Sequence, residues 1–288
     1  MRAKVESAGE GERPAARRRV RSLRGAAAFV DRAGLALVYP ADDLALPSLW
    51  EAVSGQSEVS WAVRDERGGF VEFTPDFERV WRWKDELPDR RLAIMGKHIR
   101  GRAALLSLDS IGALYALTGR PGRPHDFRDV ELSELELEVA EAILDGGPLS
   151  TADVHELLGR DRKRTNAAID SLQRKLVLTG AGAQERPQGW PAVVVDILAR
   201  RFATQLRQLP APDGARAELA TAVLRSAGEL SAADLAAIIG GSRRLAAATL
   251  ERLVGEDVAR RHDEDELALW RATRPRAIPG AAKSGAKR

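Results

Sequence analysis

The fold is decided by a stretch that occurs twice, as Gly147-Pro-Leu-Ser-Thr-Ala-Asp153 and as Gly228-Glu-Leu-Ser-Ala-Ala-Asp234. The likeness continues without a gap over 147–177 and 228–258, where ten of the thirty-one aligned pairs are identical. Several of the other pairs keep their apolar character, so the same buried positions recur. The chain therefore uses one structural unit twice.

The first half of the unit predicts two helices. Apolar residues at helical spacing over 135–143 predict the first helix, which ends at Gly146-Gly-Pro148 because glycine suits a left-handed cap and proline cannot continue a helix. Ser150 followed by Asp153 resembles a capping box with the shorter acid and opens a short second helix. Gly159 ends that helix.

A third helix and a hairpin complete the unit. The helix is expected over about 162–175, and strand-like residues at 176–179 and 193–195 flank a glycine-rich, polar stretch at 180–189. Helix, helix, turn, helix and hairpin is the winged helix-turn-helix plan. The second copy repeats it, with helices near 215–227, 231–239 and 242–254 and a hairpin within 258–270. The expected fold class is mainly α with small β-hairpin wings, in tandem winged helix-turn-helix domains.

The chain has 288 residues, a length at which several smaller domains are favoured over one large core. The predicted parts, in chain order, are a disordered basic arm over 1–25, an N-terminal α+β domain of winged-helix-like character over 26–130, a winged-helix domain over 131–196, a second winged-helix repeat over 197–270, and a disordered basic tail over 271–288.

Positive charge is concentrated in the two predicted arms. Residues 1–25 carry a net charge of +5 and residues 271–288 carry +6, so the body between them is acidic although the whole chain carries +3. Flexible basic arms attract phosphate without regard to base sequence, and they also occur as solubilising ends. Both interpretations stay open.

Composition excludes several classes of protein. The chain has no cysteine, which excludes disulfide scaffolds, thiolate catalysis, zinc fingers and iron–sulfur clusters. No apolar run is long enough to cross a membrane, and no signal peptide is recognisable, so a cytoplasmic, nucleoid-associated protein is expected. Neither a metal nor a cofactor is expected, because the histidines lie far apart without metal-ligand spacing; they are His98, His125, His155 and His262.

The region before the repeat has mixed signals. Residues 28–37 read as a helix passing into an apolar run, 46–53 and 111–117 as helices, and 103–108 as a buried strand. Trp81 and Trp83 are two residues apart, so in a strand both would face one way and could stack an extruded base. Packing in the core is the commoner use of such a pair.

Candidate DNA contacts gather at the third helix of the first copy. Its first turn corresponds to the part of a recognition helix that enters the major groove, where Arg reads guanine and Asn reads adenine. Cations there oppose the helix dipole, which favours a functional reason over a merely solvated face. The candidates are Arg160, Arg162, Lys163, Arg164 and Asn166 at this helix and Gln184, Arg186 and Gln188 on the wing.

A second basic cluster precedes the buried strand, at Lys97, His98, Arg100 and Arg102. It is either a phosphate contact or a solvated turn. Four acids occur at Glu131, Glu134, Glu136 and Glu138, and they are interpreted as the solvated face of their helix.

The second copy has a different surface. Its third helix carries Arg243 and Arg244 and then a run of alanines, and its wing contains four consecutive acids at 263–266. Acids on a wing repel phosphate. Contact with DNA is therefore assigned to the first copy, and packing or a protein partner to the second.

The segment Arg100-Gly-Arg-Ala-Ala-Leu-Leu-Ser-Leu-Asp109, the opening of the first repeat and the duplicated plan resemble the YcaQ/AlkZ-like proteins over residues 26–270. A subset of AlkZ-related proteins is more similar, through 46–53 and 83–88. The resemblance implies a bacterial tandem winged-helix protein, and several members are DNA glycosylases that remove bulky alkylated or crosslinked bases.

The resemblance also implies a catalytic motif, Gln-x-Gln or Gln-x-Asp, that this chain lacks. The matching stretch is 33–39, which places Leu37 and Tyr39 at the two polar positions, and a family histidine falls near Ala104. Asp42 and Asp43 follow closely and are the candidates to substitute for the missing carboxylate, unless they only cap the turn after Pro40.

The residues favour a protein that binds double-stranded DNA and does not catalyse base release, and the resemblance alone implies a repair context. One alternative is an active glycosylase, which would need a carboxylate or amide pointing into the DNA cleft. The other is a protein-interaction module, favoured by the acidic body and the acidic second wing.

Overall fold

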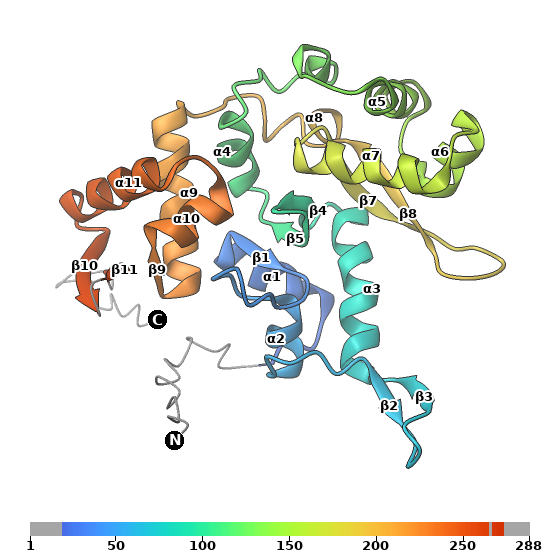
Figure 1. Cartoon of the computed structure of the whole chain (residues 1–288), viewed down its shortest axis with the longest axis horizontal. Coiled ribbons are helices and arrows are strands. Elements are labelled where there is room, and N and C mark those ends of the chain that lie inside the picture. Colours follow the sequence, from blue (N-terminus) through green and yellow to red (C-terminus); the bar gives the residue numbers. More distant parts are fainter. Residues whose placement is uncertain (1–18, 265–266, 274–288) are drawn as a thin grey trace, which may run out of the picture.

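The computed structural model describes residues 19–264 and 267–273, and Figure 1 shows the first and second repeats on either side of the N-terminal region. The expected mainly α fold is wrong, because the protein is mixed α/β. Strands from the N-terminal region and the first repeat join in one antiparallel sheet of six strands, in the order β1-β5-β4-β7-β8-β6. This sheet crosses the domain boundary expected near residue 130.

The N-terminal region combines helices with short strands. Its elements are α1 (Leu23–Ala33), β1 (Leu35–Leu37), α2 (Leu49–Ser54), β2 (Ala62–Arg64), β3 (Phe70–Phe73), α3 (Pro75–Asp89), β4 (Ile94–Ile99), β5 (Arg102–Leu106), α4 (Ser110–Ala116) and a 3-10 helix at Asp126–Asp129.

Ordered structure begins within the predicted basic arm. The N–H of Val20 donates to Ala52 O at 2.8 Å, the Val20 side chain is buried, and Ser22 caps α1. At the other end, β11 continues to Ala272. The remainder of both predicted arms, 1–18 and 274–288, lies outside the described residues.

The two copies of the repeated sequence form the same order of elements, apart from a short helix that follows the first copy. The first copy contains α5 (Glu134–Gly146), β6 (Leu149–Ser150), α6 (Thr151–Leu158), α7 (Arg162–Arg174), β7 (Leu178–Gln184), β8 (Ala192–Ile197) and the short α8 (Leu198–Arg201). The second contains α9 (Pro212–Ala227), β9 (Glu229–Ser231), α10 (Ala232–Ile239), α11 (Arg243–Gly255), β10 (Ala259–Glu264) and β11 (Leu267–Ala272).

Local geometry repeats along with the elements. Ser150 and Ser231 each form a capping box with the aspartate three residues later, as the sequence predicts. The residue that turns the chain into the hairpin has a left-handed backbone in both copies, with φ of 55° at Leu176 and 59° at Asp257. Such a φ is uncommon for a residue other than glycine. The two copies therefore share a backbone path as well as a sequence pattern.

The glycine-rich stretch, expected as a loop, forms strand β7 as far as Gln184. β7 joins the two halves of the sheet, since Gly180 pairs with Met95 of β4 and Thr179 Oγ1 donates to Met95 O at 2.9 Å. A Cβ on Gly180 would lie 3.1 Å from Met95 Sδ and 3.3 Å from Met95 O. The absence of a side chain at Gly180 therefore permits this pairing.

A second contact fixes β4 against the end of α7. The N–H of Lys97 donates to Gln173 Oε1 at 2.9 Å, and His98 Nδ1 lies 2.7 Å from Gln173 O. The imidazole lies against Gly96, where a Cβ would come within 2.5 Å of Nε2. Burial lowers the pKa of His98 to about 4, although its hydrogen bond to the Gln173 carbonyl acts in the opposite direction. His98 is therefore neutral in the folded protein at pH 7.

The two repeats differ in how they are held. The first has its own cluster of buried side chains, which includes Val139, Ile143 and Leu172. The second shares a core with the N-terminal region, in which residues of α9 and α11 are buried together with those of β1, β5 and α4. Within the described residues, no helix is long and apolar enough to cross a membrane.

We expect the stability of the protein to fall as the pH drops from about 6.5 towards 4. Unfolded His98 becomes protonated near its ordinary pKa of 6.5, whereas the folded side chain stays neutral down to about 4. The contribution of neutral His98 to the free energy of unfolding is thus complete above pH 6.5, and about 3 kcal/mol of that contribution is lost by pH 4. Urea unfolding of the wild type and of His98→Gln at several pH values measures it. The same pH dependence in the variant over this interval would contradict the assignment.

Candidate nucleic-acid interface

The first turn of α7 presents two unpaired cations. Asp161 caps the helix by accepting from the N–H of Arg164 at 2.8 Å. Arg162 and Lys163 follow it with exposed side chains, and neither has an ion-pair partner among the residues that the structure describes. Asn166, also exposed, lies one turn further on, where its Oδ1 is 3.0 Å from His155 Nε2 of α6. These cations are available to an anionic ligand.

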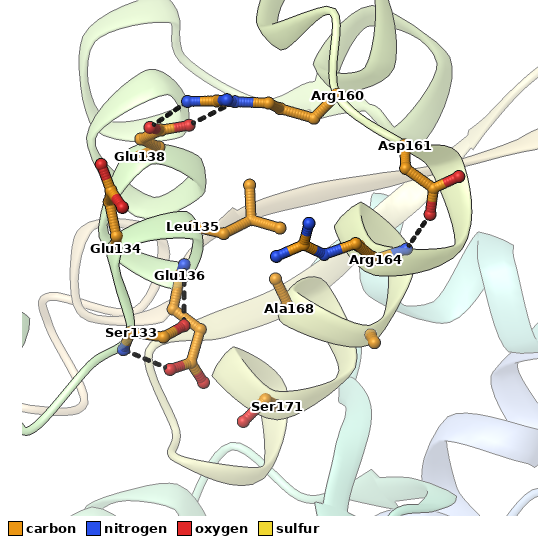
Figure 2. A pocket seen from close by; sticks show the side chains of 11 residues that line it. Ser133, Glu134, Leu135, Glu136, Glu138, Arg160, Asp161, Arg164, Ala168 and Ser171 are labelled. Carbon is orange, nitrogen blue, oxygen red and sulfur yellow. Dashed lines mark hydrogen bonds and ion pairs between the residues drawn. The ribbon is translucent and has the colours of Figure 1, made fainter.

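Arg164 belongs to another face of the same turn. It lines a groove of about 540 Å³ between α5 and α7, and Figure 2 shows its guanidinium directed towards Leu135 and Ala168. Glu134 and Glu138 line the same groove. Successive side chains of a helix are rotated by about 100°, so those of Arg162 and Arg164, two residues apart, point to nearly opposite sides. They cannot both face the same flat ligand. The predicted set of DNA contacts is thus divided by the helix.

Arg160 is engaged within the protein. Its Nη2 and Nε donate to the two carboxylate oxygens of Glu138 at 2.7 and 3.2 Å, across the groove in Figure 2. A phosphate would have to compete with this two-point ion pair.

The interpretation of the four acids as a solvated face is wrong for Glu136, which is buried. Its carboxylate accepts from the N–H of Ser133 at 2.7 Å and from Lys175 Nζ at 2.9 Å. Burial alone would raise the pKa of Glu136, but the hydrogen bonds from Ser171, Ser133 and Lys175 lower it to about 2. Glu136 ties the start of α5 to the end of α7.

The basic cluster before the buried strand does not form one cationic patch. Lys97 Nζ pairs with Asp170 of α7 at 2.5 Å, and Arg102 pairs with Asp43 at 3.2 Å. His98 is half-buried and bonded to Gln173, as described above. Arg100 remains exposed in the turn between β4 and β5, with no charged partner in the described part of the chain. Of the four, only Arg100 presents a free charge.

The wing residues are open to solvent. Arg186 and Gln188 lie in the loop between β7 and β8, both exposed, and Gln184 ends β7. The same loop carries Trp190, which is 57% exposed.

Trp81 and Trp83 both lie on α3, so the strand geometry in which both could stack an extruded base does not apply. Thr74 caps this helix, accepting from the N–H of Phe77, and Pro75 opens it. Side chains two residues apart on a helix point to nearly opposite sides. Trp83 is accordingly buried in the core at 3% exposure, whereas Trp81 is half-buried and lies 5.2 Å from the Trp190 ring.

The hairpin of β2 and β3 was not predicted. It exposes Trp61 and Phe70 next to the contact between Trp81 and Trp190. A signal was present: Arg67-Gly-Gly69 lies between two short apolar runs, which is a pattern typical of a hairpin turn.

The stretch that matches the catalytic motif lies in the interior. Leu35 and Leu37 belong to β1 and are fully buried. Tyr39 follows between Trp50 and Phe77, and its hydroxyl has no hydrogen-bond partner among residues 19–264 and 267–273. Burial, and secondarily Asp85, raise the pKa of Tyr39 above its ordinary value. The phenol is therefore neutral and the motif positions offer no carboxylate.

The candidate substitutes Asp42 and Asp43 are both exposed. Asp43 pairs with Arg102, and in the described chain neither carboxylate caps the turn after Pro40. An exposed aspartate paired with arginine has none of the apolar shielding that surrounds a buried catalytic carboxylate.

The second repeat presents an apolar groove where the first presents cations. Arg243 and Arg244 border this groove of about 500 Å³, whose other lining residues are Ser231, Ala232, Ala233, Ala247, Leu267, Ala268 and Trp270. Asp263 and Glu264 of β10 are exposed, and the other two acids of the predicted acidic wing lie outside the described residues.

Three groups that can ligate a metal approach one another in the second repeat. Ligand atoms of Glu229, His262 and Glu264 lie within 4.8 Å of one another. Arg271 already pairs with Glu229. A metal cation would thus face a guanidinium, which opposes binding.

Comparison with known proteins identifies the class. The chain belongs to the AlkZ-related family, whose model matches residues 20–240, as the resemblance predicts. Two solved structures are similar: a DNA glycosylase AlkZ of Streptomyces sahachiroi, at 22% identity with 70% of this chain and 57% of that chain covered and a TM-score of 0.46, and the DIP2311 protein of Corynebacterium diphtheriae, at 18% identity, 68% and 36% coverage and a TM-score of 0.22. The chain spans little more than half of that AlkZ structure. Among curated proteins, none matches.

One tryptophan is buried and another is exposed, which predicts different costs of truncation. We expect Trp83→Ala to lower the free energy of unfolding by about 3–5 kcal/mol, since it empties a buried site. Trp61→Ala removes a ring that is 43% exposed, and its cost is expected to be below about 1 kcal/mol. Chemical unfolding of both variants measures the difference, and equal losses would contradict the placement of Trp83 in the core.

Proposed function

We propose that this protein binds duplex DNA through its first repeat, in a DNA-repair context, and does not itself cleave the glycosidic bond. The observation that carries the proposal is the pair of unpartnered cations Arg162 and Lys163 on the exposed first turn of α7. The repair context is supported by membership of the AlkZ-related family, since the AlkZ protein of Streptomyces sahachiroi is a DNA glycosylase. A cytoplasmic, nucleoid-associated location follows from this role.

The arrangement of the first repeat supports the mode of binding. α6, a tight turn and α7 form a helix-turn-helix, and β7 and β8 form a hairpin beside it, which we interpret as a recognition helix with its wing. The second repeat follows the same plan, so we propose tandem winged helices. In this interpretation Arg162, Lys163 and Asn166 approach the bases, while Arg186 and Gln188 follow the backbone or the minor groove.

The second repeat is proposed to pack against the N-terminal region and to bind a protein partner. The apolar groove bordered by Arg243 and Arg244 favours this role over DNA contact, because most of its lining is alanine, leucine and tryptophan. Exposed Asp263 and Glu264 also oppose a phosphate backbone.

Loss of the two unpartnered cations tests the DNA-binding proposal. We expect Arg162→Ala with Lys163→Ala to weaken duplex binding and to reduce the salt dependence by about one unit of slope for each lost phosphate contact. The fold should be unaffected, because removing cations from a helix N-terminus relieves an unfavourable interaction with its dipole. Fluorescence anisotropy with a labelled duplex, across a salt series, measures both quantities.

The duplication supplies a matched control. Arg243→Ala with Arg244→Ala changes the equivalent positions of the second repeat and should leave duplex affinity nearly unchanged. Equal losses from the two double variants would overturn the assignment of the first repeat as the DNA-binding unit.

Catalysis has its own test. Base excision needs a group that positions water or stabilises positive charge as the base departs, and buried Leu37 and neutral Tyr39 supply neither. We expect a duplex containing N7-alkylated guanine to be bound without abasic sites forming above the spontaneous rate. Release that disappears in Asp42→Asn or Asp43→Asn would instead support the glycosylase alternative and make that loop carboxylate the catalyst. Release that survives both would place the catalyst elsewhere.

A further inference from the structure

Aromatic rings from three separate parts of the chain form one exposed surface. Trp61, Phe70 and Phe73 come from the hairpin of β2 and β3, Trp81 from α3 and Trp190 from the loop between β7 and β8; these five residues are the aromatic surface. The described part of the chain has ten exposed large apolar side chains, and six of them lie in or beside it: Val59, Trp61, Val63, Phe70, Val71 and Trp190. Such a concentration marks a binding surface.

Ring contacts make the surface continuous. Trp61 stacks on Phe70 with centroids 6.0 Å apart and planes 17° apart, and Phe70 meets Phe73 at 5.0 Å. Trp190 bridges the hairpin to α3, since its centroid lies 5.6 Å from that of Phe73 and 5.2 Å from that of Trp81. The rings support one another, so little side-chain freedom remains to be lost when a ligand binds.

The surface is contiguous with the proposed DNA-binding wing. Trp190 belongs to the loop that carries Arg186 and Gln188, two of the residues expected to follow the DNA backbone. A duplex held by α7 and this loop would therefore pass close to the aromatic rings.

Charge limits what the surface can hold. Three cations lie near the rings: Arg64 is 5.1 Å from the Trp61 ring, Lys84 is 4.1 Å from the Trp81 ring and pairs with Asp85, and Arg67 is exposed on the hairpin. The hairpin itself also exposes three acids, Asp65, Glu66 and Glu72, which outnumber its two arginines. These acids oppose a phosphate backbone running along the hairpin. They would also repel their own copies across a two-fold contact between two chains. The surface therefore favours uncharged, flat ligands that stack face-on against the rings.

We propose that the aromatic surface stacks nucleobases that have left the double helix, next to a duplex held by the first repeat. The proposal rests on the proposed function. Every base has a π face, so stacking on tryptophan and phenylalanine tolerates any sequence, and the acids keep the backbone away from the rings. The favoured ligand is thus a duplex with a short run of unpaired bases.

The experiment compares two DNA probes, a fully paired duplex and the same duplex with an internal run of unpaired bases. The wild type should bind the second more tightly. Trp61→Ala and Trp190→Ala should each lower affinity for the unpaired probe by roughly tenfold and leave affinity for the paired probe unchanged. Trp190→Phe should restore most of the loss. Leu245→Ala, which truncates an exposed apolar side chain of α11, is the matched control and should change neither affinity.

Several outcomes would overturn the proposal. One is a wild type without preference for the unpaired probe, or a preference that both alanine variants retain. Equal losses on both probes would make the surface part of the duplex interface. A dimer that sedimentation shows to dissociate in the same variants would make it a contact between copies. If neither probe is bound by the wild type, the proposed function fails as well, whereas tight binding of the paired duplex without preference overturns only the stacking.

Discussion

Close approach of three backbone segments at two glycines holds the fold together. Gly180 lets β7 pair with Met95 of β4, and Gly182, whose φ of 125° few side chains tolerate, leaves room for Asp89 at the end of α3. A Cβ at Gly182 would lie 3.1 Å from that of Asp89. Together with the contacts of Lys97 and His98 to α7, these contacts join the N-terminal region to the first repeat. The position of the wing relative to α3, and with it the meeting of Trp190 and Trp81, depends on this joint.

The parts of the fold that the sequence predicts are those encoded locally. Capping boxes, glycine stops and apolar periodicity located α6, α7, α10 and α11, since each signal acts within one turn of helix. Gly180 and Gly182 led to the wrong expectation of a loop, because the reason for a small residue there is a neighbour far away in the chain: Met95, 85 residues before Gly180, and Asp89, 93 residues before Gly182. The six-stranded sheet depends on such distant pairings and was not predicted.

The candidate site was predicted with the same limits. The sequence correctly placed Arg162, Lys163 and Asn166 at the start of the third helix of the first copy, where they are exposed. Arg160, Lys97 and Arg102 have the same chemistry, yet acids from elsewhere in the chain pair with them: Glu138, Asp170 and Asp43. Composition alone does not distinguish a free cation from a paired one. The tryptophans illustrate a different limit, since spacing has a meaning only once the element is known to be a helix or a strand.

The separate core of the first repeat has a consequence for how this lineage can change. Side chains on the exposed turn of α7 share no buried partners with the cluster that joins the second repeat to the N-terminal region. Substitutions at such independent sites have additive effects on stability. Mutation can therefore alter the exposed turn of α7 with little effect on the packing of the second copy, which is embedded through α9. Two copies of one sequence unit thus differ in how freely their exposed turns can change.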